Sequence, residues 1–127
     1  MASLTLDEII VYQRAMQFGE RIYSIVIAWK YFSQTTIGKQ LIEASDSIAA
    51  NISEGYGRYF FKENRNFCFY ARGSLTETKT WIIKANNRKL IQEEEAKLLL
   101  SEIEILHKML NRYIKSIGRK SLVTSDQ

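Results

Sequence analysis

The sequence contains no proline, where average usage of about 5% predicts roughly six. Proline breaks helix interiors, so its absence is typical of a chain that is helical along most of its length. The single cysteine, Cys68, excludes an internal disulfide framework and cannot by itself hold a zinc ion. The single histidine, His107, leaves few options for acid–base chemistry.

Long apolar runs are missing as well. No run approaches the roughly 18 residues needed to span a bilayer, so we expect no membrane segment. The opening MASLTLDEII lacks a basic region followed by an apolar core, so it does not resemble a secretory signal, and we expect a cytoplasmic protein. The 18 Lys and Arg residues outnumber the 14 Asp and Glu residues, and the net charge of +4 favours polyanionic partners.

Four stretches place apolar residues at the three-to-four spacing of one helix face: about 6–32, 38–56, 61–85 and 93–117. The polar stretches SQTT and ANNRK separate them, and Thr35 or Thr36 is expected to cap the second helix. The predicted buried face of the first helix is Ile9, Tyr12, Met16, Gly19, Ile22, Tyr23, Val26 and Trp29.

The ends of these stretches carry residues typical of helix termini. Thr5 and Glu8 form a capping-box pattern, Glu93–Glu95 suit the positive end of a helix dipole, and Gly118 is expected to stop the last helix. The pattern predicts an all-α fold, an antiparallel up-down four-helix bundle with long helices. We expect residues 1–120 to form one domain and residues 121–127 a flexible C-terminal tail.

The stretch SDSIAANISEGYGRYF, residues 45–60, is rich in small residues and allows two interpretations. It could be a loop that binds a phosphate, or a helix whose small side chains let neighbouring helices come close. A phosphate loop needs the GxxxxGK[ST] pattern between a strand and a helix, which is missing, whereas Ile48 and Ile52 keep helical spacing. We therefore predict a tightly packed helix, with Gly55 or Gly57 as its left-handed cap.

LIEASDSIAANISEGYGR, followed by FCFYARGSLTETKT, resembles the four-helix-bundle 23S rRNA intervening sequence proteins, also labelled S23-type ribosomal proteins. The motif positions to which we assign a structural role are Asn51, Glu54, Gly55, Gly57, Gly73, Ser74 and Glu77. Many relatives carry paired arginines where this chain has Ile42 and Glu43, so any RNA contact made by those arginines is missing here.

The resemblance implies a small bundle that assembles with copies of itself into a closed ring, commonly a pentamer, with no known catalysis. A related branch, the accessory variability determinant (Avd-like) proteins of diversity-generating retroelements, binds a reverse transcriptase and nucleic acid. The family name records where the genes lie, so a ribosomal function does not follow from it.

Catalytic and metal-binding groups are sparse. Glu104 and His107 have the Glu-x-x-His spacing of di-iron bundles, but such sites need two of these motifs and further glutamates. A nucleophilic Cys68 would need a neighbouring base, and the one imidazole belongs to another helix. We expect no enzyme activity, no metal and no cofactor.

One set of basic and aromatic residues, here called the aromatic–basic face, follows roughly helical spacing after the glycine turn: Arg58, Tyr59, Phe61, Lys62, Arg65, Phe69 and Arg72. We predict that it is exposed and turned away from the core. Arginines and aromatics can grip phosphates and stack on bases, but they are also enriched in protein interfaces. We favour an assembly or partner surface over base stacking.

A second basic set, here called the C-terminal stripe, consists of Lys108, Arg112, Lys115, Arg119 and Lys120. No acidic residue occurs from His107 to Lys120, so the positive fields add. Cations that merely complement the helix dipole belong in the last turn, which accounts for Lys115 and Arg119 but not for Lys108 or Arg112. Polyanion binding and a solvated helix end remain comparable interpretations.

The leading hypothesis is a non-enzymatic ring of helical bundles that binds nucleic acid, RNA above all, through its basic surfaces. The rival hypothesis is a protein adaptor that docks a nucleic-acid enzyme such as a reverse transcriptase on the aromatic–basic face.

Overall fold

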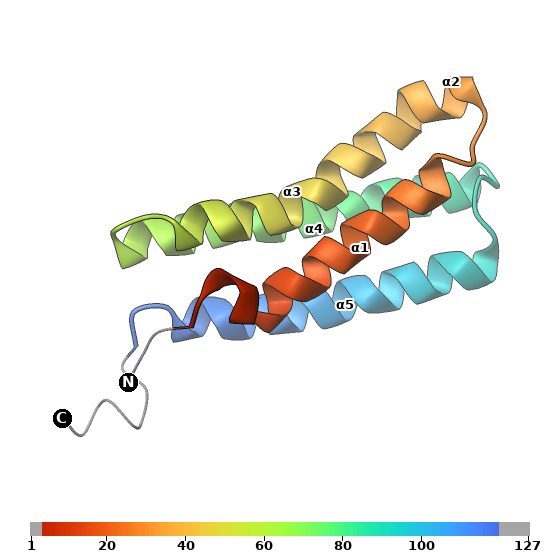
Figure 1. Ribbon diagram of the computed structural model, residues 1–127. Helices are drawn as coiled ribbons and strands as arrows, with labels where there is room; N and C mark the ends of the chain where they lie inside the picture. Colours follow the sequence, from red (N-terminus) through yellow and green to blue (C-terminus); the bar gives the residue numbers. More distant parts are fainter. Residues whose placement is uncertain (1–3, 120–127) are drawn as a thin grey trace.

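The computed structural model describes residues 4–119 of the chain. Every regular element in this range is helical: the 3-10 turn η1 (Leu6–Glu8), α1 (Ile10–Val26), α2 (Tyr31–Ser33), the π-helical turn η2 (Gln34–Gly38), α3 (Lys39–Tyr56), α4 (Phe61–Asn87) and α5 (Glu93–Ser116). The long helices α1, α3, α4 and α5 pack side by side (Figure 1). The predicted all-α four-helix bundle is confirmed for this range, and the predicted tail lies outside it.

Two hydrogen bonds between the ends of helices show in which directions the long helices run. The Tyr56 hydroxyl at the end of α3 donates a hydrogen bond to the Leu4 carbonyl ahead of α1, at 2.8 Å. The Arg65 guanidinium near the start of α4 donates to the Ile117 carbonyl after α5, at 3.2 Å. The ends of α3 and α5 therefore meet the starts of α1 and α4, and these helix pairs are antiparallel, as predicted.

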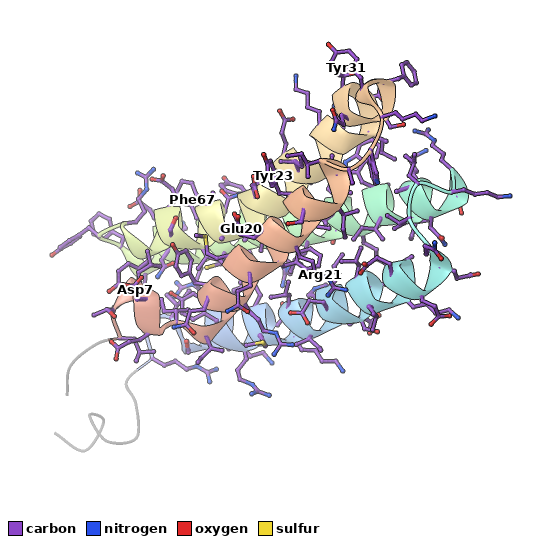
Figure 2. The ribbon with its side chains drawn as sticks, turned by 45° about the vertical axis from the view of Figure 1, so that its right-hand side comes forward. Asp7, Glu20, Arg21, Tyr23, Tyr31 and Phe67 are labelled. Carbon is purple, nitrogen blue, oxygen red and sulfur yellow. The ribbon has the colours of Figure 1, made fainter. Side chains whose placement is uncertain are left out.

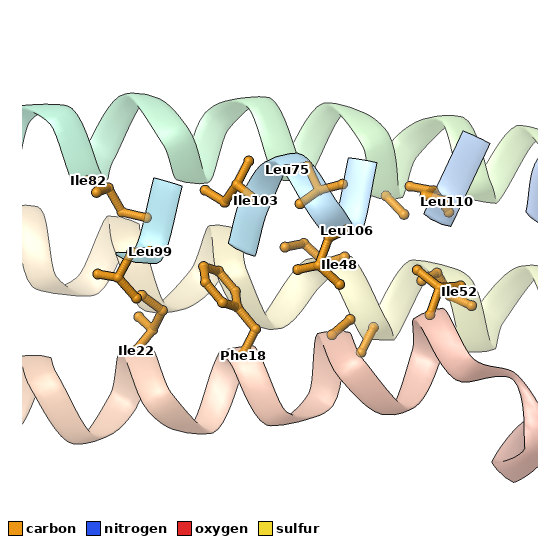
Figure 3. Close-up of a cluster of buried hydrophobic side chains, with 14 of the residues drawn as sticks. Phe18, Ile22, Ile48, Ile52, Leu75, Ile82, Leu99, Ile103, Leu106 and Leu110 are labelled. Atoms are coloured by element: carbon orange, nitrogen blue, oxygen red, sulfur yellow. The ribbon is translucent and has the colours of Figure 1, made fainter. Parts of the chain in front are cut away.

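The core is a layer of aliphatic side chains supplied by all four long helices (Figure 3). Each helix contributes at least one with 0% exposure, such as Ile22, Ile48, Leu75 and Leu106. Burial of an apolar side chain of this size stabilises a fold by about 1.5–3 kcal/mol relative to its exposure. This layer holds the bundle together along its length.

The prediction for the end of the first helix was wrong. The helix α1 ends at Val26, and the next helical stretch begins at Tyr31, so SQTT lies within it and caps nothing. The Thr36 hydroxyl donates to the Phe32 carbonyl one turn back, at 2.7 Å, a bond found for threonines that lie inside a helix and not at its cap. Lys30, in extended conformation, precedes this stretch instead.

The buried face of α1 overlaps the predicted one, with Gly19, Ile22 and Val26 buried as expected, but it is rotated from it. Val11, Ala15 and Phe18 are buried, whereas Met16 and Tyr23 keep 47% and 49% of their surface exposed. Because α1 is apolar around much of its circumference, two overlapping rows have helical spacing and the period alone cannot choose between them. One apolar row is therefore left outside the core.

The small residues of α3 bring it close to α4, as predicted. A Cβ atom on Gly55 would lie 2.8 Å from the Asn64 carbonyl oxygen and 3.0 Å from the Cβ of Phe67. The predicted left-handed cap was wrong, because Gly55 lies within α3 and Gly57 has φ −77°. The left-handed glycine is Gly118, with φ +81°, where α5 was expected to stop.

Candidate nucleic-acid interface

The C-terminal stripe lies on the outer side of α5. Lys108, Arg112 and Lys115 are exposed at steps of four and three residues, which place them on one helix face. Arg119 is also exposed, just beyond the helix, and Lys120 lies outside the described residues. The opposite face of α5 buries Leu106 and further aliphatic residues, so the fold itself turns these cations toward solvent.

No carboxylate within residues 4–119 forms an ion pair with Lys108, Arg112, Lys115 or Arg119. The ion pairs in this range are Arg14–Glu102 at 2.7 Å, Arg21–Glu95 at 2.6 Å and Arg58–Glu54 at 3.1 Å. Two of them engage acids of α5 with arginines of α1, away from the stripe. The positive field along the second half of α5 is therefore available to an outside partner.

The aromatic–basic face is less free than predicted. The Arg65 guanidinium donates to the Ile117 carbonyl, and Arg72 donates to Asn111 Oδ1 at 2.9 Å, so both half-buried side chains reach α5. Arg72 also stacks on the ring of Phe69, at 4.9 Å. The prediction that these arginines turn away from the bundle was wrong, because the end of α5 lies beside them.

Arg58 also has intramolecular partners. It pairs with Glu54 one turn earlier and lies 4.7 Å from the ring centroid of Phe67. Lys62 is exposed and has no ion-pair partner in the described part of the chain. The most exposed members of the face are therefore Lys62 and two aromatic side chains, Tyr59 at 88% and Phe61 at 61% exposure. Phe69 keeps 42% exposure beside the Arg72 guanidinium.

The structure brings the two basic sets together. A Cβ atom on Gly118 would lie 3.2 Å from the Phe61 ring and 3.3 Å from Arg65 Nη1, so the start of α4 touches the end of α5. Residues 58–72 hold four cations and one acid, and residues 108–119 hold four cations and no acid. Sequence spacing could not reveal this convergence, which depends on how α4 and α5 pair.

The predicted structural motif positions make mostly local contacts. Asn51 donates to the Ser47 carbonyl within α3 at 2.9 Å, and Glu77 accepts from Trp81 Nε1 within α4 at 3.1 Å. The Ser74 carbonyl accepts from the Thr78 hydroxyl at 2.7 Å. Gly73 differs, since a Cβ atom there would meet nothing within 4 Å.

The residues weighed for catalysis are not assembled into a site. His107 is half-buried and Glu104 is exposed on α5, and the described residues contain no group of three His, Cys, Asp or Glu side chains able to hold a metal ion. Cys68 is buried, and burial raises the pKa of its thiol to about 11. None of the described helices is both long and apolar enough to cross a membrane.

Residues 7–112 match the sequence model of the 23S rRNA-intervening sequence protein family. The chain belongs to this family. Among solved structures it is similar to a protein of unknown function from the S23 ribosomal protein family of Bacteroides thetaiotaomicron, with a TM-score of 0.75 and 22% identity. The likeness covers 84% of this chain and 96% of the other, and at this identity it shows the fold alone. No curated protein matches the chain.

The match to the 23S rRNA-intervening sequence protein family ends within the C-terminal stripe. Lys108 and Arg112 lie within the matched residues 7–112, whereas Lys115 and Arg119 follow them. The match also covers the whole of α1, α3 and α4. The match therefore covers most of the bundle and two of the four described positions of the stripe.

Proposed function

We propose that this chain is a non-enzymatic, oligomeric helical-bundle protein that binds nucleic acid, RNA above all, through the C-terminal stripe. The observation that carries the proposal is the exposure of Lys108, Arg112 and Lys115 without a carboxylate partner within residues 4–119. Lysine and arginine side chains held in a row contact successive phosphates and release condensed counterions.

The neighbouring arginines strengthen this field. Arg65 and Arg72 are bonded to neutral acceptors, a carbonyl and an amide oxygen, so they keep their full positive charge beside α5. A helix-dipole role accounts for cations in the last turn only, and Lys108 lies two turns before the end of α5. Phosphate binding gives all members of the stripe a common role.

A charge-reversal experiment tests the proposal. We expect Lys108→Glu with Arg112→Glu to weaken binding of a structured RNA at least about tenfold and to lower the log–log salt slope by about two. Fluorescence anisotropy between roughly 50 and 200 mM salt measures both quantities. The matched control, Lys84→Glu with Lys97→Glu, makes the same change of charge on exposed positions outside the stripe.

Two outcomes would contradict nucleic-acid binding at this site. One is that neither RNA nor DNA binds the wild-type chain at low salt above a neutral control protein. The other is an equal loss of affinity in the stripe variant and the matched control.

The exposed aromatics support a second candidate function, an adaptor that docks a nucleic-acid enzyme such as a reverse transcriptase. Tyr59, Phe61 and Phe69 are large apolar side chains left in solvent, as expected of an interface. An adaptor would lose its partner in a pull-down on Phe69→Ala or Lys62→Glu and keep it on reversal of Lys108 and Arg112. Arg65 is unsuitable for this test because its substitution would also remove the hydrogen bond to the Ile117 carbonyl.

A further inference from the structure

The apolar row that α1 leaves outside the core borders a groove between α1 and α3. Tyr12 and Met16 form one wall, and Gly19, Ala49 and Ala50 keep the floor low because their side chains are small or missing. The groove has a volume of about 250 Å³. That is below the roughly 300–1,000 Å³ typical of cofactor pockets, so it suits one or two protein side chains.

Two carboxylates line this groove. Glu20 comes from α1 and Asp46 from α3, and a Cβ atom on Gly19 would lie 2.8 Å from Asp46 Oδ1. Partial burial, together with the charge of Glu20, raises the pKa of the Asp46 carboxyl above its usual range. Within residues 4–119 neither acid has an ion-pair partner, so the groove presents uncompensated negative charge.

Exposed apolar side chains extend the groove along α1. Tyr23 and Ile27 follow Met16 on the same side of the helix, at 49% and 55% exposure, and Figure 2 shows Glu20 and Tyr23 along this side. An apolar strip with an acidic centre is the surface expected for a partner that is apolar and basic.

The same chain carries such a surface at its α3–α4 turn. Tyr59, Phe60 and Phe61 are 88%, 62% and 61% exposed, and Lys62 follows them without an ion-pair partner in the described residues. We call residues 59–62 the corner. Figure 1 shows this turn at the end of the bundle where α3 finishes and α4 begins. The exposed fractions of its aromatic side chains leave them accessible to a neighbour.

We propose that the α1–α3 groove receives the corner of a second copy of this chain, with Lys62 facing Asp46 and Glu20 and the corner aromatics packing on the apolar row of α1. This proposal deepens the oligomeric part of the proposed function and rests on it. The groove and the corner are different surfaces, so the contact is heterologous and repeats from copy to copy, closing into a ring where the rotation allows.

Multi-angle light scattering on the full chain at two protein concentrations tests this contact. We expect the wild type to have the mass of an oligomer, and Asp46→Lys or Lys62→Glu each to reduce it to one subunit. The exchange of both charges, Asp46→Lys with Lys62→Glu, restores the pair in reverse and should restore the mass. Ala50→Trp fills the groove from an exposed position and should also give single subunits.

Matched controls make the same charge changes elsewhere on the bundle. Glu104→Lys and Lys84→Glu alter exposed residues outside both surfaces and should leave the mass unchanged. Circular dichroism on every variant checks that the helices are intact. A wild type of single-subunit mass, an unchanged mass in Asp46→Lys, or a double variant that stays dissociated would each overturn the proposal.

RNA titration of the same samples separates the two proposals. Asp46→Lys leaves the C-terminal stripe intact, so its subunits should still bind RNA through Lys108 and Arg112. A monomeric wild type that binds RNA would overturn the groove contact and retain nucleic-acid binding. An oligomer that dissociates as predicted but binds no RNA would support the groove contact and overturn nucleic-acid binding.

Discussion

Cys68 illustrates how burial sets the chemistry of a single residue. The side chain has 0% exposure, and burial raises the pKa of its thiol to about 11. At pH 8 only about one such thiol in a thousand is ionised, against about one in four for a free cysteine of pKa near 8.5. Since the thiolate is the reactive form, Cys68 is expected to be inert in the folded chain.

We expect a disulfide reagent such as dithionitrobenzoate to react with native Cys68 at least about 100-fold more slowly than with the unfolded chain at pH 8. The native rate should rise as pH approaches 11, because the thiolate fraction grows toward the pKa of about 11. Absorbance of the released thiol measures both rates. Stoichiometric labelling of the native chain within seconds at pH 8 would contradict this burial.

Contacts between residues close in sequence could be predicted, and distant ones could not. The Glu54–Arg58 pair is one helical turn apart, and the Thr5 backbone N–H donates to Glu8 Oε1 at 2.8 Å as the capping pattern requires. Arg65 instead finds its acceptor 52 residues further along the chain, in Ile117. Helical spacing says nothing about such a partner, so Arg65 was expected to be free.

At the scale of the helices, Gly55 is the close point between α3 and α4. We expect Gly55→Ala to destabilise the fold by about 1–3 kcal/mol, since the new Cβ would lie 2.8 Å from the backbone oxygen of Asn64, which cannot rotate away. Chemical denaturation monitored by circular dichroism measures the change.

Gly57→Ala is the matched control, two residues further along. A Cβ atom there would lie 3.6 Å from its nearest neighbour, the Glu54 carbonyl, and φ is −77°, which any residue adopts. We expect a change within about 0.5 kcal/mol. Equal effects at both glycines would show that α3 and α4 do not approach each other as closely as described.

At the scale of the whole molecule, assembly into an oligomer should increase the affinity of the C-terminal stripe for RNA. An oligomer presents several C-terminal stripes to one RNA, so binding of the second stripe becomes intramolecular. We expect the dissociated Ala50→Trp subunit to bind a long structured RNA at least about tenfold more weakly than the wild type, with a shallower salt slope. Affinity measured against salt concentration decides this, and identical slopes for the two proteins would exclude cooperation between subunits.

Local effects set the helical class, the start of α5 at three glutamates and its end two residues before the left-handed Gly118, because capping, dipole and proline effects act within a few residues. The tertiary structure alone decided which side of α1 is buried and that the two basic sets meet where α4 begins and α5 ends. Those outcomes depend on which helices pair and at what rotation, and this choice is made by packing between residues far apart in the chain.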